Sequence, residues 1–293
     1  MNKRSWLLDW LPPRLVDFLR KMPRRYGWSG DYPTWGKAMA DCSGYQLHGI
    51  LEKVRDAGLE VMAGRAAFER DSVIFSEVEY SWSLLTQLML VSAHGQGRLH
   101  ILDFGGALGS TYFQNRKYFR GLREIRWCVV EQPHFVQCGL EHFQNDELRF
   151  YYDVEECIKE GRPSAVLLSS VLQYLPNPDC VLGSLLERQF DFIIIDRTSF
   201  SNDGREHIAV QHVDPRIYRA SYPCHFFSRQ KFLDKFATDY ELLAELPALD
   251  RCNYSGYFSG FAFRRRSSAS ATFLDADFEA KLARQQAACG VRP

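Results

Sequence analysis

The residues best placed to do chemistry lie in a glycine-rich turn between an apolar run and a predicted helix. The run is Leu99-His100-Ile101-Leu102-Asp103-Phe104, and the turn is Gly105-Gly106-Ala107-Leu108-Gly109. Glycines allow the backbone to approach a ligand closely, because no Cβ blocks the approach. Asp103 stands two residues before the first glycine, where a carboxylate suits a cationic amino group or its water shell. We therefore interpret Gly105, Gly106 and Gly109 as a ligand-binding turn, with Asp103 as its acid.

A second acid, Glu131, ends the next apolar run, 22 residues after Gly109. An acid at this place can accept hydrogen bonds from both hydroxyl groups of a ribose. The dinucleotide fingerprint requires glycines at its first, third and sixth positions, but counting from Gly105 the third is Ala107 and the sixth is Ser110. Together, the turn and the two acids favour a nucleoside-containing ligand and disfavour NAD.

Five short apolar runs predict buried strands, with helices in the intervals between them. The runs are residues 99–104, 125–131, 148–152, 165–170 and 190–196. Strands and helices that alternate in this way form right-handed crossovers and a sheet covered on both faces. Two later strands, 240–246 and 256–264, are joined by a short loop and are predicted to be antiparallel. The predicted fold is therefore α/β, with a doubly wound, mostly parallel seven-stranded sheet.

The remaining segments suggest a domain organisation around this sheet. Residues 1–95 are predicted to form an N-terminal cap, with an aromatic loop at 26–35 and helices at 45–57 and 82–93. Residues 96–266 form the predicted sheet domain. Residues 267–293 are poor in large apolar side chains and are predicted to be a disordered tail.

The composition excludes several classes of function. Lys plus Arg and Asp plus Glu both number 36, whereas nucleic-acid-binding proteins usually carry a basic excess, so no nucleic-acid partner is expected. The eight cysteines lack the paired spacing of a zinc site, so we expect no metal, and free thiols in apolar runs favour a cytoplasmic location. No apolar run is long enough to cross a bilayer. The sequence does not indicate an oligomeric state.

The first 25 residues form a separate basic segment. Seven Lys or Arg residues stand there against two Asp residues, which gives a charge of +5 beside the apolar anchors Trp6, Trp10 and Phe18. A basic amphipathic segment of this kind can rest weakly on an anionic membrane surface. Alternatively, it packs on its own domain.

These residues resemble the motifs of class I methyltransferases, which bind S-adenosylmethionine (SAM). That superfamily carries an acid-x-Gly-x-Gly-x-Gly turn, a ribose-binding acid after strand two and an acid after strand three. Asp103 to Gly109, Glu131 and Asp153 match those places, although Ala107 stands where the middle glycine is common. The stretch from Ser169 to Pro178 is similar to the strand-four motif of the superfamily, with Gln173 in place of a frequent histidine.

A narrower resemblance covers roughly residues 24–266. The segments that carry it are Tyr26 to Trp35, Asp103 to Gly106, Asp196 to Thr198 and Ala220 to Pro223. Together they resemble a family assigned as methyltransferases and associated with bacterial surface-polysaccharide gene clusters. The resemblance implies methyl transfer from SAM to an oxygen or nitrogen of a small molecule or saccharide.

The resemblance also implies roles for three further polar residues. It places Asp153 near the adenine, although the same residue could be the N-cap of a helix. Ser169 and Ser170 could line the cofactor or simply end a strand. Two other classes of protein stay open, namely an NAD-dependent or nucleotide-sugar enzyme and a binding module with a degenerate SAM fold.

The methyl acceptor is expected beside the long segment 197–227, which we predict to be a functional loop that Gly204 allows to move. Asp196, His212 and Tyr222 are its candidates for contact or proton removal. Asp196 ends the fifth apolar run, and ligands in open α/β sheets lie outside the carboxyl ends of the strands. His212 could take a proton near neutral pH, and Tyr222 could orient the acceptor. The structural alternatives are an ion pair of Asp196 with a neighbouring arginine, a solvated His212 and a packing role for Tyr222.

Overall fold

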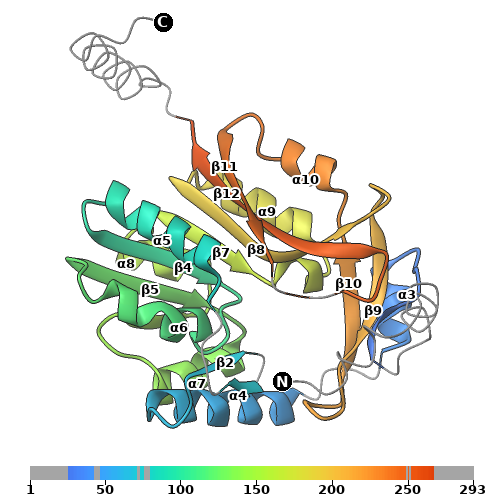
Figure 1. The fold of residues 1–293 in the computed structure, drawn as a ribbon, viewed down its shortest axis with the longest axis horizontal. Coiled ribbons are helices and arrows are strands. Elements are labelled where there is room, and N and C mark those ends of the chain that lie inside the picture. Colours follow the sequence, from blue (N-terminus) through green and yellow to red (C-terminus); the bar gives the residue numbers. More distant parts are fainter. Residues whose placement is uncertain are drawn as a thin grey trace, which may run out of the picture.

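The computed structural model describes residues 26–42, 47–70, 73–75, 80–248, 250 and 252–266. The basic N-terminal segment and the predicted C-terminal tail lie outside these residues. The centre of the fold is a seven-stranded sheet in the order β11-β12-β8-β7-β4-β5-β6 (Figure 1). Its strands are β4 (Arg98–Phe104), β5 (Glu124–Val130), β6 (Leu148–Tyr151), β7 (Ala165–Ser169), β8 (Phe192–Ser201), β11 (Tyr240–Pro247) and β12 (Gly256–Arg265).

The pairing within this sheet confirms the predicted doubly wound, mostly parallel arrangement. Strands β4 to β8 pair with their neighbours in parallel. Strand β12 runs antiparallel to both β8 and β11, as predicted for the last two strands.

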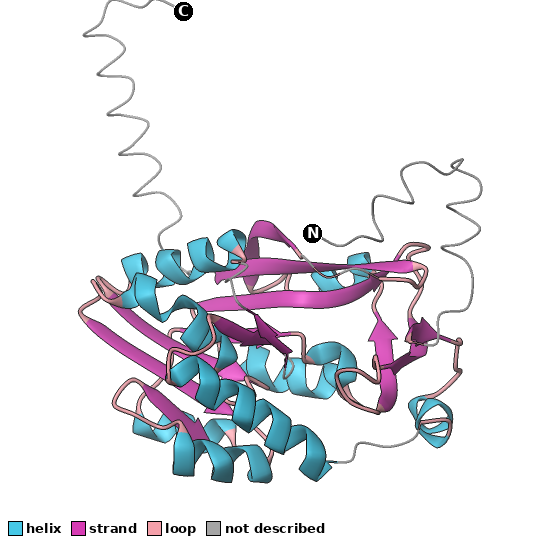
Figure 2. Cartoon of the chain, turned by 60° about the horizontal axis from the view of Figure 1, so that its bottom comes forward, coloured by secondary structure: helices cyan, strands magenta, loops and turns pink. Residues whose placement is uncertain are grey.

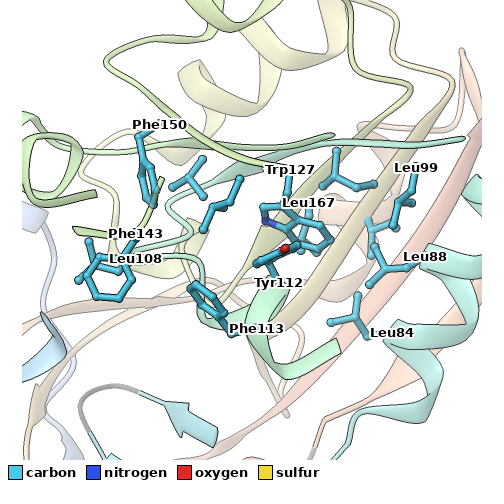
Figure 3. Packing of buried hydrophobic residues seen from close by; sticks show 14 of the residues in the cluster. Leu84, Leu88, Leu99, Leu108, Tyr112, Phe113, Trp127, Phe143, Phe150 and Leu167 are labelled. Carbon is cyan, nitrogen blue, oxygen red and sulfur yellow. The ribbon is translucent and has the colours of Figure 1, made fainter. Parts of the chain in front are cut away.

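Helices cover both faces of the sheet. One face carries α4 (Leu47–Met62), α5 (Trp82–His94), α6 (Ser110–Phe119) and α7 (Pro133–His142), and the other carries α8 (Val154–Glu160), α9 (Pro178–Glu187) and α10 (Arg229–Asp234). Because side chains alternate along a strand, Ile101 and Trp127 join the first core, while Leu102 and Cys128 join the second. Figure 3 shows Trp127 among the side chains of the first core. Within the described residues, no helix combines the length and apolar character that crossing a membrane requires.

The prediction of a loop at 197–227 is wrong, because most of this segment is β-structure. Strand β8 continues to Ser201, and β9 (His207–His212) and β10 (Ser221–Phe226) follow. Strand β9 pairs antiparallel with β10 and with β1 (Gly27–Ser29), which lies inside the predicted aromatic loop. Figure 1 shows β9, β10 and α3 (Trp35–Ala40) together at one end of the molecule. In the turned view of Figure 2, the short strands at this end run across the long strands.

Strand β8 links the two sheets, so Asp196 does not end it as the sequence predicted. The parallel pairing with β7 stops at Ser169 and Asp196, and the next residue, Arg197, has a φ of +51°. Opposite this point the register of β12 shifts, and a Cβ on Gly260 would lie 2.4 Å from the Ile195 carbonyl oxygen. The second half of β8 leaves β7 here, and Phe200 forms a bridge with Phe227, the residue that follows β10. Asp196 therefore lies at the point where β8 separates from β7.

Candidate functional site

The glycine-rich turn connects the end of β4 to the start of α6. Gly105, Ala107 and Gly109 have φ values of +74°, +50° and +87°, the left-handed region that glycine adopts most easily. The turn folds back over Asp103, since a Cβ on Gly106 would lie 2.5 Å from the carboxyl group of Asp103. Gly109 is the N-cap of α6 and so shapes the turn rather than lining a cavity.

The carboxyl group of Asp103 is buried beneath this turn, with only 1% of the residue exposed. It accepts a hydrogen bond of 2.9 Å from the indole Nε1 of Trp127, which the packing around β5 holds in place (Figure 3). Burial, and to a smaller extent the negative charges of Glu131 and Asp196, together raise the pKa of Asp103 to about 7, against the opposing effect of the indole N–H. Near neutral pH, a cation at this place would therefore stabilise the ionised form of Asp103.

Glu131 follows β5 and faces the same turn. The backbone N–H groups of Gln132 and Ala107 both donate to its carboxylate, and burial raises its pKa. The side chain is half-buried. A carboxylate offers about four lone-pair sites, so Glu131 keeps acceptor capacity for the hydroxyl groups of a ligand.

A cavity of about 550 Å³ opens in front of the turn, at the carboxyl ends of β4, β5 and β7. This volume lies within the range of ~300–1,000 Å³ that is usual for small-molecule sites. The structure brings seven of the predicted site residues together in its wall: Asp103, Gly105, Gly106, Glu131, Ser169, Ser170 and Tyr222.

Asp196 lies in a smaller pocket of about 50 Å³ that shares Ser169 and Arg197 with the main cavity. The residue is 2% exposed, and its Oδ2 accepts a hydrogen bond of 2.8 Å from the hydroxyl group of Ser169. The guanidinium of Arg197 turns to Asp250, with 3.0 Å between Nε and Oδ2. A buried carboxylate and an ion pair therefore lie side by side where the two sheets separate.

Besides Gly109 and Asp196, two further predicted site residues do not line the cavity. Asp153 is exposed, and its Oδ1 accepts the backbone N–H of Glu156 at 2.8 Å, which makes it the N-cap of α8. His212 is exposed on β9, whereas its neighbour Gln211 lines the cavity. Since successive side chains point to opposite faces of a strand, His212 faces away from the cavity. The structure thus matches the N-cap alternative for Asp153 and the solvated alternative for His212.

The structure adds an aromatic wall to the predicted residues. Trp28 and Tyr222 are the direct cross-strand partners of Gln211, so one row crosses β1, β9 and β10 and faces the cavity. Tyr174, from the 3-10 helix η1 (Leu172–Tyr174), donates its hydroxyl to Oε1 of Gln211 at 2.7 Å. For Gln211, the signal available in the sequence was the alternation of side chains along residues 207–212.

Glu69 is a further acid that the sequence did not single out. It lies on β2 (Phe68–Arg70), is 4% exposed and lines the cavity. Its carboxylate accepts a hydrogen bond from the hydroxyl group of Ser110, the first residue of α6. Nothing in its local sequence marks Glu69, because its position depends on how β2 packs against α6.

No protein-family model and no curated protein sequence matches this chain. Solved structures with a similar fold include an S-adenosylmethionine-dependent methyltransferase from Clostridium acetobutylicum, at a TM-score of 0.43 and 8% identity, over 72% of this chain and 98% of the other. The N-terminal domain of EvdMO1 with S-adenosylhomocysteine (SAH) bound aligns at a TM-score of 0.41 and 15% identity, over 73% of this chain and 97% of the other. CalS10, an amino pentose methyltransferase from Micromonospora echinaspora, aligns at 0.40 and 11%, over 64% and 92%.

Proposed function

We propose that the protein is a SAM-dependent methyltransferase. The observation that carries this proposal is that Asp103 and Glu131, at the ends of neighbouring parallel strands, flank one glycine-rich turn and line one cavity. In open α/β sheets, ligands bind at this edge. The two acids differ in their surroundings, since one is buried below the turn and the other is half-buried beside it.

The residues fit the parts of SAM in a definite way. Glu131 would accept the ribose hydroxyl groups, and the backbone of Gly105 and Gly106 would lie along the methionine portion. Asp103 would hold the ammonium group, either directly or through water. The bound cofactor would supply a methyl group on a sulfonium, which an acceptor takes with a lone pair while the bonding pair stays on sulfur.

The acceptor would lie on the side of the cavity formed by Tyr222 and by the pocket of Asp196. Tyr222 would orient the acceptor, and the Asp196 carboxylate could receive a proton, a contribution typically worth ~10²- to 10⁴-fold in rate. His212 and Asp153 are not part of this proposal. The resemblance noted above supports a small molecule or saccharide of surface-polysaccharide biosynthesis as the acceptor. The free thiols of the described cysteines support a cytoplasmic location for the protein.

Two alternatives make different predictions. An NAD-dependent or nucleotide-sugar enzyme would use the same strand ends, but Ala107 and Ser110 stand where the dinucleotide turn needs glycine. A degenerate binding module would bind the cofactor without turning it over.

Calorimetric titration of the full chain with SAM, SAH and NAD tests the proposal. We expect saturable binding of SAM and SAH and no binding of NAD at the same concentrations. Binding of NAD alone would replace the proposal with the oxidoreductase alternative. Absence of binding by all three would contradict every nucleoside-binding interpretation of the turn.

A further inference from the structure

The acceptor side of the cavity is built as an aromatic corner. Trp28, Gln211 and Tyr222 form a row across three paired strands, with one aromatic ring on each side of the Gln211 amide. The ring of Tyr174 stands at 89° to that of Tyr222, with 5.2 Å between the ring centres. Phe258 of β12 packs against Trp28, with 5.3 Å between the ring centres, and also lines the cavity. Rings from four elements therefore surround one end of the cavity.

The charged residues that line the cavity as a whole are mainly acidic. Among the described residues that line the cavity, the acids are Glu69, Asp103, Glu131 and Asp250, and the cation is Arg197. Arg197 already forms hydrogen bonds with both carboxylate oxygens of Asp250. A cavity lined by one sign of charge concentrates ligands of the opposite sign.

The N-terminus of α6 is the part of the cavity most suited to an anionic ligand, but it already contacts an acidic side chain of the protein. A helix N-terminus favours anions, and α6 begins at the cavity with Ser110. The hydroxyl group of Ser110 donates to the buried carboxylate of Glu69. This contact disfavours a second anion, such as the phosphate of an activated acceptor, at the start of α6.

We propose, on the basis of the methyltransferase function proposed above, that the group methylated is an amine. Aromatic faces attract ammonium groups, best when the site is shielded from water, and the acids of the cavity add to that attraction. An amine enters as an ammonium ion, and its proton must leave before its lone pair can attack. The carboxylate of Asp196, in the pocket that adjoins the cavity, can receive this proton. The nitrogen then forms the new bond to carbon, and sulfur keeps the electron pair of the bond that breaks.

Binding of choline by the full chain, saturated with SAH, tests this inference without any turnover. Choline carries a quaternary ammonium, and 3,3-dimethylbutan-1-ol has the same shape without the charge. A ligand-observed NMR titration at fixed ionic strength compares the two. We expect choline to bind at least about fivefold more tightly than the alcohol, as a cation in contact with more than one ring should. Equal affinities, or tighter binding of the alcohol, would overturn the inference.

Variants of Tyr222 locate the binding. Tyr222→Leu should reduce choline affinity about fivefold or more, while Tyr222→Phe should retain it because the ring remains. His212→Ala, on the opposite face of the neighbouring strand, is the matched control and should behave as wild type. If Tyr222→Leu keeps SAH and choline affinity unchanged, the aromatic corner is not the amine site. If the wild type does not bind SAH, the proposed function itself fails, and the two failures are thereby distinguished.

Discussion

At the scale of single residues, Asp103 is the site residue whose negative charge a bound cation would stabilise most clearly. A buried carboxyl group with a pKa near 7 is only partly ionised at neutral pH, and the acids Glu131 and Asp196 make its charge more costly. Trp127 provides one stabilising hydrogen bond. An ammonium group of a ligand would offset the remaining free-energy cost of this charge. Loss of the carboxylate should therefore lower the ligand affinity but raise the stability of the ligand-free protein.

The affinity for SAH should therefore depend on pH through Asp103. Between pH 6 and 8 the ionised fraction of this carboxyl group rises about tenfold if its pKa is about 7. We expect SAH affinity, measured by calorimetry, to rise by up to about tenfold over that range. Asp103→Asn should bind more weakly and show a flatter profile. An identical slope in the variant would assign the pH dependence to another group, such as Glu131.

The same substitution should stabilise the ligand-free protein at high pH. The pKa of Asp103 is higher in the folded chain than its ordinary value of 3.8, so stability is lost as the pH rises from about 4 through 7. Asparagine cannot ionise and keeps an oxygen that accepts the indole N–H. Asp103→Asn should raise the Tm at pH 8 by a few degrees, at about 2–4 °C per kcal/mol. Little change is expected at pH 4.

At the scale of secondary-structure elements, the parallel strands could be predicted because they are continuous apolar runs. Ile193, Ile194 and Ile195 are buried on both faces of β8, and such runs indicate a covered sheet. Asp103 and Glu131 could be predicted as site residues for the same reason, since each stands at or just after the end of such a strand. Both positions can be recognised from the residues next to them in the sequence.

The second sheet could not be predicted in this way. Its central strand β9 pairs with β1, which comes from a distant part of the chain. Strand β10 contains Pro223, and a proline within a run argues against a strand unless the strand lies at an edge, as β10 does. Because β9 was not predicted to be a strand, the sequence could not show that Gln211 faces the cavity and that His212 faces away from it.

The N-cap of α8 provides a test at this scale. Asp153→Ala removes the acceptor for the backbone N–H of Glu156, which should cost about 1 kcal/mol of folding free energy. Thermal unfolding would measure that loss. SAH affinity should stay within about twofold of wild type. A large loss of affinity with little loss of stability would instead support a place for Asp153 beside the adenine.

At the scale of the whole molecule, the cavity is lined by residues of the seven-stranded main sheet and of the small sheet β1-β9-β10. The main sheet contributes the glycine-rich turn and the acids, and the small sheet contributes the aromatic wall. Strand β8 belongs to the main sheet and reaches the small one, with Asp196 at the point where it leaves β7. In the proposed function, the seven-stranded sheet would hold the cofactor, and the small sheet, together with Asp196 and Phe258 of the seven-stranded sheet, would hold the acceptor.

The affinity for SAH of the wild type, Glu131→Ala and Glu124→Ala tests the proposed cofactor site most directly. Glu124 is an exposed acid at the opposite end of the same strand and serves as the matched control. Calorimetric titration should show SAH binding by the wild type and by Glu124→Ala. Glu131→Ala should lose ~1–3 kcal/mol, or about 5- to 150-fold in affinity. No binding by the wild type, or equal affinity in Glu131→Ala, would contradict a SAM site at the ends of β4 and β5.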